Sequence, residues 1–300
     1  MDEEMVKKLQ EIVGHIKIQE PMKNHTSFRI GGPADLLIEI EKPEQAADVL
    51  RILKDYGEDY MIMGNGSNLL VSDKGIRKAV IKISGLTSAY VVQGETITAQ
   101  AGILLSRLAT VALKEGLSGL EFASGIPGTL GGGVFMNAGA YGGEMKDVVK
   151  SVTYMDEAGA MHTIGAEELE FGYRRSVFTG KNWIILSCTL QLKRGQYEDI
   201  RLKMADLTKR RTEKQPLSMP SAGSVFKRPE GHFAGKLIED AGLKGYIIGG
   251  AMVSEKHSGF IVNRGGATAA DVTALIRYIQ QTVEEKFAVH LEPEIKLIGE

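Results

Sequence analysis

The stretch Glu121-Phe-Ala-Ser-Gly-Ile-Pro-Gly-Thr-Leu-Gly-Gly-Gly-Val-Phe-Met-Asn-Ala-Gly-Ala-Tyr-Gly-Gly-Glu144 contains eight of the 36 glycines of the chain and almost no charge. Glycine has no Cβ and tolerates positive φ, so a run this dense lets another body approach the main chain closely. The pyrophosphate or the ring of a nucleotide cofactor would be such a body. A set of turns at a crowded strand crossing is the alternative, because glycine serves that purpose too.

The composition is that of an ordinary globular protein, with 300 residues of which 43% are hydrophobic and 25% charged. A chain of this size can form two or three hydrophobic cores. The net charge of -2 gives no sign of a surface for nucleic acid or anionic lipid. The acidic N-terminus and the lack of a long apolar run predict a cytoplasmic protein without a membrane partner.

Cysteine and histidine usage narrows the chemistry further. Cys188 is the only cysteine, which excludes an internal disulfide, and its strand-like surroundings predict a buried thiol. The six histidines have no spacing suited to zinc, so no metal site is expected.

Hydrophobic periodicity predicts an α+β protein with several domains. A small βαβ-type module comes first, with strands at 36–40, 61–63 and 79–83 and a helix at 44–56. A strand-rich region follows, with a strand at 96–100, a helix at 104–114, a hairpin over 152–164 and a strand at 183–192. A helix at 196–214 ends before Pro216, and beyond it helices at 235–241 and 269–287 alternate with strands near 247, 259–262 and 293–298. Thr268 is the expected N-cap of the last helix.

Two further glycine-bearing loops precede the long segment. Gly64-Asn-Gly-Ser-Asn-Leu69 follows a predicted strand and could turn several backbone N–H groups toward a diphosphate. It lacks the Lys-Ser/Thr end of a Walker loop and the third glycine of the dinucleotide fingerprint, so a simple strand-terminating turn stays open. Thr26-Ser-Phe-Arg-Ile-Gly-Gly-Pro33 offers Arg29 for a phosphate and Gly31 for close approach, or it is an entry turn to the first strand.

These segments together resemble those of the UDP-N-acetylenolpyruvoylglucosamine reductase family. The similarity rests on Asn24-His-Thr-Ser-Phe-Arg-Ile-Gly-Gly, Gly64-Asn-Gly-Ser-Asn-Leu-Leu, Gly125-Ile-Pro-Gly-Thr-Leu-Gly-Gly and Asn137-Ala-Gly-Ala-Tyr-Gly. It continues in Phe171-Gly-Tyr-Arg-Arg-Ser-Val-Phe178, Ser221-Ala-Gly-Ser-Val-Phe-Lys-Arg-Pro229 and Leu291-Glu-Pro-Glu-Ile-Lys-Leu-Ile-Gly299. These motifs occur in the same order as in the family and cover nearly the full chain. Together they identify the family far more specifically than any single glycine loop.

The resemblance implies noncovalent FAD in a two-subdomain fold of the vanillyl-alcohol-oxidase type, followed by an α/β substrate-binding domain. Residues 1–85 and 86–200 would form the two FAD-binding subdomains and 210–289 the substrate-binding domain, with the final strand, 290–300, returning to the second subdomain. The implied cofactor-binding residues are Arg29, Gly31, Gly64, Asn65, Gly66, Ser67, Asn68, Ser124, Gly125, Pro127, Gly128, Gly131, Gly132, Asn137, Ala138 and Gly139.

The family reaction passes hydride from NADPH, through the flavin, to UDP-N-acetylglucosamine enolpyruvate, giving UDP-N-acetylmuramate for peptidoglycan. Hydride addition leaves negative charge beside the substrate carboxylate, which a guanidinium stabilises well. By motif position Arg174 is this residue rather than Arg175, and a structural ion pair is its alternative. Ser224 matches the proton donor and Glu294 the supporting carboxyl, while a turn serine and a solvated strand-end carboxylate are the alternatives.

Four residues are candidates for substrate binding. Arg211 and Lys214 lie at helical i, i+3 spacing and could bind the diphosphate or carboxylate, or they form a solvated helix end. Lys227 or Lys214 could stabilise the Ser224 alkoxide, and Tyr173 could line the pocket or its rim. The stretch from Phe178 to Gln196 has room only for a turn and one strand, so the chain resembles the shorter subclass of the family, without the tyrosine-bearing insertion.

Two other kinds of protein stay open from the sequence. One is an FAD-dependent oxidase of the same fold, which the Ser224 motif argues against. The other is a flavin- or nucleotide-binding subunit without catalysis. In each case the expected partners are small molecules, and the chain is expected to be a monomer or a weak oligomer.

Overall fold

The computed structural model describes residues 2–83 and 87–300 and contains two compact units. Unit 1 comprises Met1–Ile18, Leu36–Asn65 and Lys78–Arg210, and unit 2 comprises Gln19–Asp35, Gly66–Arg77 and Arg211–Glu300. The chain therefore passes between the units several times. The predicted domain boundary at residues 85 and 86 lies outside the described residues, and the three-domain division stays a prediction.

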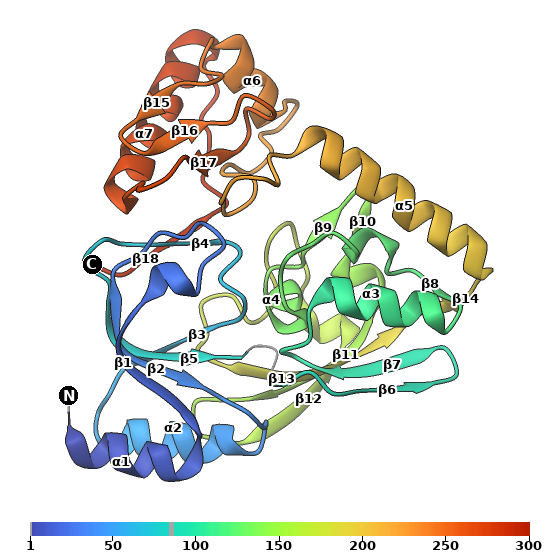
Figure 1. Cartoon of the computed structure of the whole chain (residues 1–300). Helices are drawn as coiled ribbons and strands as arrows, with labels where there is room; N and C mark the ends of the chain where they lie inside the picture. Colours follow the sequence, from blue (N-terminus) through green and yellow to red (C-terminus); the bar gives the residue numbers. More distant parts are fainter. Residues whose placement is uncertain (1, 84–86) are drawn as a thin grey trace. The chain divides into compact units, whose positions relative to one another are not determined.

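Unit 1 is built on a five-stranded antiparallel sheet (Figure 1). Its order is β12-β11-β13-β7-β6, formed by β6 (Tyr90–Gln93), β7 (Thr96–Gln100), β11 (Val149–Met155), β12 (Met161–Gly165) and β13 (Ile184–Gln191). Helices α3 (Leu105–Lys114) and α4 (Leu130–Phe135) pack beside it, and α4 contacts β7 and β13. The predicted hairpin, the predicted strands and the predicted helix at 104–114 are confirmed here.

Two helices of unit 1 pack on each other, α1 (Glu3–Ile12) and α2 (Gln45–Asp55). The carboxylate of Asp2 caps α1 by accepting from the N–H groups of Glu4 and Met5. Met5 and Leu9 are buried one helical turn apart, so α1 presents one apolar face to the core. The sequence reasoning did not predict this helix.

A second sheet has the order β1-β2-β5-β3, formed by β1 (His15–Pro21), β2 (Pro33–Glu39), β5 (Ile76–Lys82) and β3 (Tyr60–Met63). Strand β3 pairs with β5 in parallel. The order β2-α2-β3 along the chain, with β5 between the two strands in the sheet, is the predicted βαβ-type module. The short elements of unit 1 are β8 (Leu117–Ser118), β9 (Gly139–Ala140), β10 (Gly143–Glu144), β14 (Lys193–Arg194), η2 (Glu121–Ala123), η3 (Met145–Asp147) and η4 (Ala166–Leu169).

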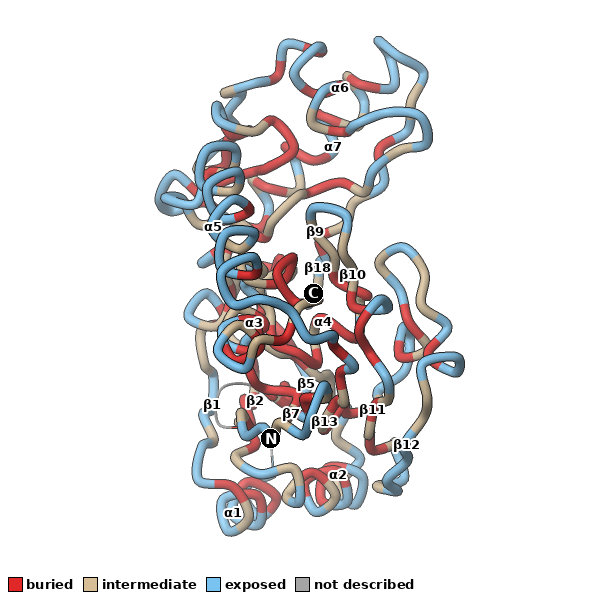
Figure 2. The backbone as a smooth tube through the Cα atoms, turned by 90° about the vertical axis from the view of Figure 1, so that its right-hand side faces the viewer, coloured by how far each residue is buried: buried red, intermediate tan, exposed pale blue. Residues whose placement is uncertain are grey.

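Helix α5 (Tyr197–Lys214) is mostly exposed, as Figure 2 shows. Only Ile200 and Leu207 are buried among its described residues. The boundary between the units falls inside this helix, after Arg210.

Unit 2 has its own hydrophobic core around α7 (Ala269–Phe287). This helix contacts a small antiparallel sheet of β15 (Ile247–Ile248), β16 (Ala251–Val253) and β17 (Ile261–Asn263). Its predicted cap is confirmed, because Thr268 and Asp271 form a capping box at its N-terminus. The other elements of unit 2 are η1 (Met22–Asn24), α6 (Ala234–Asp240), β4 (Leu69–Val71) and β18 (Lys296–Ile298).

The position of the last strand differs from the prediction. Strand β18 was expected to return to residues 86–200, but it pairs in parallel with β4, from Lys296 opposite Leu69 to Ile298 opposite Val71. The expectation was wrong because the preceding residues join the core of unit 2, where Leu291 and Ile295 are buried. Pairing with the neighbouring β4 then satisfies the main chain of the strand.

No helix within residues 2–83 and 87–300 combines the length and the apolar character that a membrane span needs. The buried thiol of Cys188 agrees with its predicted place in a strand, and burial raises its pKa.

Candidate functional site

The glycine-dense segment of unit 1 starts from a buried carboxylate. Glu121 accepts hydrogen bonds from Ser118 Oγ at 2.6 Å and from the N–H of Gly119 at 2.9 Å. Burial acts to raise the pKa of this carboxyl, but these hydrogen bonds and the charge of Lys203 together lower it. Glu121 thus stays ionised and fixes the start of the segment.

Several glycines of the predicted cofactor loops are explained by the packing of the protein itself. A Cβ on Gly64 would lie 2.5 Å from Thr129 Oγ1, and a Cβ on Gly131 would lie 3.0 Å from the Cβ of Ala101. A Cβ on Gly132 would meet only Thr129 Oγ1, at 3.4 Å. The crowded-turn explanation therefore accounts for part of the glycine content, and Gly132 is the more open position.

The structure brings two predicted cofactor segments together in unit 1. Asn65 Nδ2 donates to the carbonyl of Pro127 at 2.7 Å, which ties the loop after β3 to the segment before α4. Thr129 begins α4 and accepts from the N–H of Gly132. The turn at Gly64 and Asn65 is thereby held next to the segment from Pro127 to Gly132.

Asn137 is a structural residue at the centre of this region. It has no exposed surface and a left-handed backbone, with φ of 45°. Its Nδ2 donates to Glu144 Oε2 at 2.7 Å and to the carbonyl of Gly172 at 3.0 Å, while its Oδ1 accepts from the N–H of Lys146 at 2.9 Å. The predicted cofactor residue thus uses its side chain to hold the turn that begins at Gly172.

That turn presents Arg174. Gly172 and Arg175 pair across it, and Arg174 has a φ of 56°, a left-handed conformation that is rare outside glycine. The guanidinium lies 3.4 Å from the carbonyl of Gly139 and 4.9 Å from the ring centroid of Tyr173. Arg174, Tyr173 and Gly139 are therefore neighbours in unit 1. Residues held in such conformations cluster at active sites.

In unit 2 the structure brings Ser224 and Glu294 together, although 70 positions separate them in the sequence. The N–H of Glu294 donates to the carbonyl of Val225 at 2.7 Å. The preceding residue, Ser224, forms an antiparallel bridge with Phe260. Ser224 Oγ donates to the carbonyl of Phe226 at 3.2 Å. Both predicted catalytic residues of this unit are half-buried.

The candidate lysines differ in their surroundings. The ammonium of Lys227 forms an ion pair with Glu292, so its charge is already neutralised. Lys214 is exposed at the end of α5, while Arg211 is half-buried one turn earlier. The charge of Lys214 also reaches His257: burial is the main reason why the pKa of His257 is lowered, and this charge acts in the same direction.

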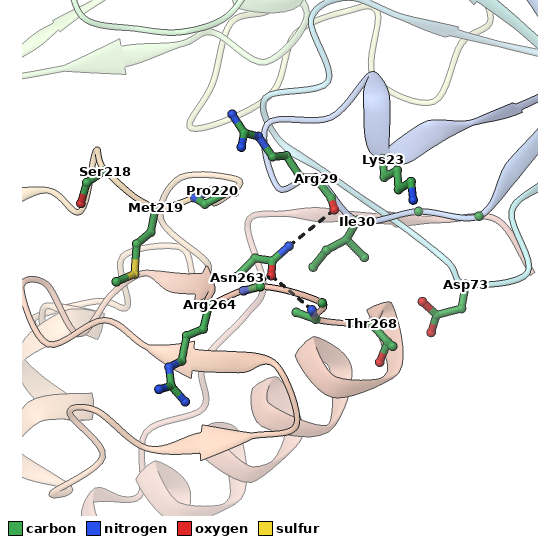
Figure 3. A pocket seen from close by; sticks show the side chains of 15 residues that line it. Lys23, Arg29, Ile30, Asp73, Ser218, Met219, Pro220, Asn263, Arg264 and Thr268 are labelled. Atoms are coloured by element: carbon green, nitrogen blue, oxygen red, sulfur yellow. Dashed lines mark hydrogen bonds between the residues drawn. The ribbon is translucent and has the colours of Figure 1, made fainter.

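A pocket of about 880 Å³ lies within unit 2 and includes two predicted cofactor residues, Arg29 and Gly31 (Figure 3). Arg29 has a left-handed backbone with φ of 55°. The lining also carries Lys23 and Arg264, so three cationic side chains border it. The pocket is lined by Lys23, Arg29, Ile30, Gly31, Gly32, Asp73, Ser218, Met219, Pro220, Asn263, Arg264, Gly265, Gly266, Ala267 and Thr268.

Two residues of this pocket were missed by the sequence reasoning. Asn263 is buried, and its Nδ2 donates to the carbonyl of Phe28 at 3.1 Å. Figure 3 shows that Nδ2 also donates to the carbonyl of Arg29, and Oδ1 accepts from the N–H groups of Gly265 and Ala267. Asp73 accepts from the N–H groups of Ala269 and Ala270 and thus caps α7. Neither residue has a sequence pattern that points to a partner so far along the chain.

Comparisons with known proteins identify relatives over the full length. Residues 34–165 match the family model described as "FAD binding domain", and residues 215–298 match "UDP-N-acetylenolpyruvoylglucosamine reductase, C-terminal domain". The chain is 55% identical to the UDP-N-acetylenolpyruvoylglucosamine reductase of Caldanaerobacter subterraneus subsp. tengcongensis, covering 100% of both chains. It is 52% identical to the enzyme of that name from Clostridioides difficile, over 95% of this chain and 94% of that protein.

Solved structures agree with the sequence relatives. The UDP-N-acetylenolpyruvylglucosamine reductase of Thermus caldophilus superposes with a TM-score of 0.82 at 38% identity, covering 95% of this chain and 100% of that one. An alkyldihydroxyacetonephosphate synthase shares the fold alone, with a TM-score of 0.51 at 17% identity over 65% of this chain and 41% of that chain. The predicted fold class is confirmed: an FAD-binding fold of the vanillyl-alcohol-oxidase type with a C-terminal substrate-binding domain.

The residues of unit 1 fit a flavin dinucleotide. Within the described part of the chain, the N–H groups of Gly125 and Gly128 have no hydrogen-bond partner. Unpaired N–H groups on a fixed, glycine-rich main chain are suited to the oxygens of a pyrophosphate. The Asn65 bond to Pro127 keeps the second loop beside them.

We predict that Asn137 stabilises unit 1 through its side-chain hydrogen bonds. Replacing Asn137 with glycine should lower the free energy of unfolding by about 2 kcal/mol, because buried groups lose their partners. Replacing it with alanine should cost about 1 kcal/mol more, because alanine also strains at positive φ. Urea unfolding of both variants measures the difference. An alanine variant as stable as the glycine variant would contradict the backbone part of this explanation.

Proposed function

Because the chain belongs to the UDP-N-acetylenolpyruvoylglucosamine reductase family, we propose that it reduces UDP-N-acetylglucosamine enolpyruvate to UDP-N-acetylmuramate with FAD and NADPH. The observation that carries the proposal is 55% identity to a named reductase over the full length of both proteins. The neighbouring positions of Ser224 and Glu294 in unit 2 support it independently. The product is a precursor of peptidoglycan, so the chain serves cell-wall synthesis.

Cofactor binding is assigned to the glycine-bearing loops. When bound, FAD supplies the hydride-transfer chemistry between NADPH and the substrate. Gly125 and Gly128 offer N–H groups to the pyrophosphate, and Asn65 orients the loop beside them. Arg29 and Gly31, on the pocket of unit 2, contribute positive charge and close backbone approach. The other predicted cofactor residues keep their assignment as part of this proposal, apart from Asn137, which has no exposed surface.

Arg174 is assigned to the negative charge that develops on the substrate. After hydride addition, the enolpyruvyl group carries this charge on a carbon next to its carboxylate, and resonance spreads it onto the oxygens. A planar guanidinium binds two such oxygens together. The left-handed turn at Arg174 and the ring of Tyr173 beneath the guanidinium hold this group in a defined direction, which supports the role.

Ser224 is assigned to protonation of the charged carbon. A serine hydroxyl is a weak acid, so this step needs a strongly basic acceptor, as an enolate carbon is, and a cation near the developing alkoxide. Lys227 is already paired with Glu292, so of the two candidate lysines Lys214 is the better one for that charge. The Ser224 hydroxyl donates to Phe226 and must rotate to reach a substrate. Glu294 reinforces the site by hydrogen bonding.

The setting of the enzyme follows from the same assignment. We propose that the chain works in the cytoplasm, as a monomer or weak oligomer, with small molecules as its partners. Between Phe178 and Gln196 the structure contains only β13, β14 and short connections, which supports the shorter subclass of the family.

The reaction itself is the first test. Purified protein supplied with NADPH and UDP-N-acetylglucosamine enolpyruvate should form UDP-N-acetylmuramate, detected by mass spectrometry as a gain of two hydrogens. Oxidation of NADPH without this product would contradict the proposed function.

Ser224→Ala should separate the two halves of the reaction. Reduction of the flavin by NADPH needs no proton from Ser224, so its rate should match the wild type. Reoxidation by the enolpyruvyl substrate should slow at least about a hundredfold, the range typical of a lost general acid. Stopped-flow absorbance measures both rates, and Ser221→Ala in the same segment is the control. Equal slowing of both halves would remove Ser224 from the proton transfer.

Arg174→Lys should be severely impaired although it keeps a positive charge. The lysine ammonium cannot bind two carboxylate oxygens in one plane, so kcat/KM should fall about a hundredfold. Arg175→Lys, one residue further in the same turn, should remain near the wild type because Arg175 is exposed. Near-normal kcat/KM in Arg174→Lys would make Arg174 a structural residue.

A further inference from the structure

The loop after β3 contains two asparagines whose amides hold different segments. Asn65 belongs to unit 1 and donates to the carbonyl of Pro127 at 2.7 Å. Asn68 belongs to unit 2 and donates from Nδ2 to the carbonyl of Glu294 at 3.2 Å. Each amide thus reaches a different functional segment, although only three positions separate the two residues.

Asn68 holds the main chain of Glu294 from one side. Besides the amide bond, the carbonyl of Asn68 accepts from the N–H of Lys296 at 2.9 Å. From the other side, the carbonyl of Val225 accepts from the N–H of Glu294 at 2.7 Å. Glu294 is therefore fixed between Asn68 and the extended segment that carries Ser224.

The strand ladder alone does not reach Glu294. Strand β18 begins at Lys296, opposite Leu69, and it has only three residue pairs with β4. Its side chains are largely exposed, so burial contributes little to its position. The hydrogen bond from the Asn68 amide adds a contact two residues before β18, at Glu294, whose carboxyl group is assigned to the proposed site.

We propose that Asn68 is a positioning residue for the protonation step, because it fixes Glu294 beside Ser224. The inference rests on the proposed function, in which Glu294 and Ser224 act on the substrate. It adds a second task to a residue that the sequence assigns to the cofactor loop. A residue that only bound the cofactor would affect cofactor affinity and both half-reactions, whereas a positioning residue affects the substrate half.

The test compares Asn68→Ala with Asn65→Ala, its counterpart in the same loop. With saturating FAD, Asn68→Ala should slow reoxidation by the substrate about tenfold more than it slows flavin reduction by NADPH, as expected for a lost hydrogen bond. Asn65→Ala, which removes a bond within unit 1, should not slow the substrate half selectively. Slowing of both halves alike in Asn68→Ala would overturn the proposal.

Hydrogen exchange gives a readout that needs no turnover. In Asn68→Ala the backbone amides of residues 292–298 should exchange at least about fivefold faster than in the wild type, because a bond that closes this segment is lost. Asn65→Ala should leave these amides unchanged. Unchanged exchange of residues 292–298 in Asn68→Ala would contradict the positioning role even if the proposed function is correct.

The isosteric variant Asn68→Asp provides a second route should the alanine variant unfold. It keeps the volume and one acceptor oxygen but loses the donor to Glu294, so it should show the same selective slowing and faster exchange. If the wild type formed no UDP-N-acetylmuramate, the proposed function would fail, while exchange of residues 292–298 would still decide the placement of Glu294.

Discussion

The hydrogen bond from the N–H of Glu294 to the carbonyl of Val225 is the contact on which the proposed chemistry of unit 2 depends. It joins the end of the chain to the segment that carries Ser224, and the neighbouring residues Val225, Phe226, Leu291 and Ile295 are buried in one core. A backbone bond among buried apolar side chains is costly to break, because both groups would lose their partners away from water. The two residues to which the proposed function assigns catalysis are therefore adjacent through main-chain pairing, which does not depend on side-chain flexibility.

Three of the positions that the sequence assigns to function have a left-handed backbone. Seven non-glycine residues of the described chain have positive φ, and Arg29, Asn137 and Arg174 are three of them. Such conformations persist where the surroundings hold them. Asn263 holds the turn of Arg29 by bonding the carbonyl of Phe28, and Asn137 holds the turn of Arg174 by bonding the carbonyl of Gly172. The buried side-chain amides of Asn263 and Asn137 thus hold the turns that carry Arg29 and Arg174.

The sequence predicts the long helices and the strands of the large sheet because their patterns are local. The apolar spacing of α2, α3 and α7 and the cap at Thr268 lie within a few turns of chain. Helix α1 was missed although Asp2 and the buried pair Met5 and Leu9 form a local pattern that could have revealed it. The return of β18 to β4 could not be predicted, because three-residue strands carry little pattern and their partners are set by packing.

The candidate site was only partly predictable, because the sequence motifs are local whereas several contacts of the site join distant segments. The motifs identify Ser224, Arg174 and Glu294 as residue types, but they do not reveal that Lys227 pairs with Glu292 or that Asn137 is buried. Those facts depend on contacts between distant segments. Likewise, the sequence shows that glycines are dense in 121–144, whereas the structure shows that Gly131 is required by the neighbouring Ala101.

The central claim is that the glycine-bearing loops hold a flavin that passes reducing equivalents from NADPH to the enolpyruvyl substrate. An anaerobic titration of the purified protein tests it most directly. NADPH should bleach the yellow flavin absorbance, and UDP-N-acetylglucosamine enolpyruvate should then restore it with about one equivalent in the absence of oxygen. A reduced flavin that only oxygen restores, or a protein that binds no flavin, would contradict the account.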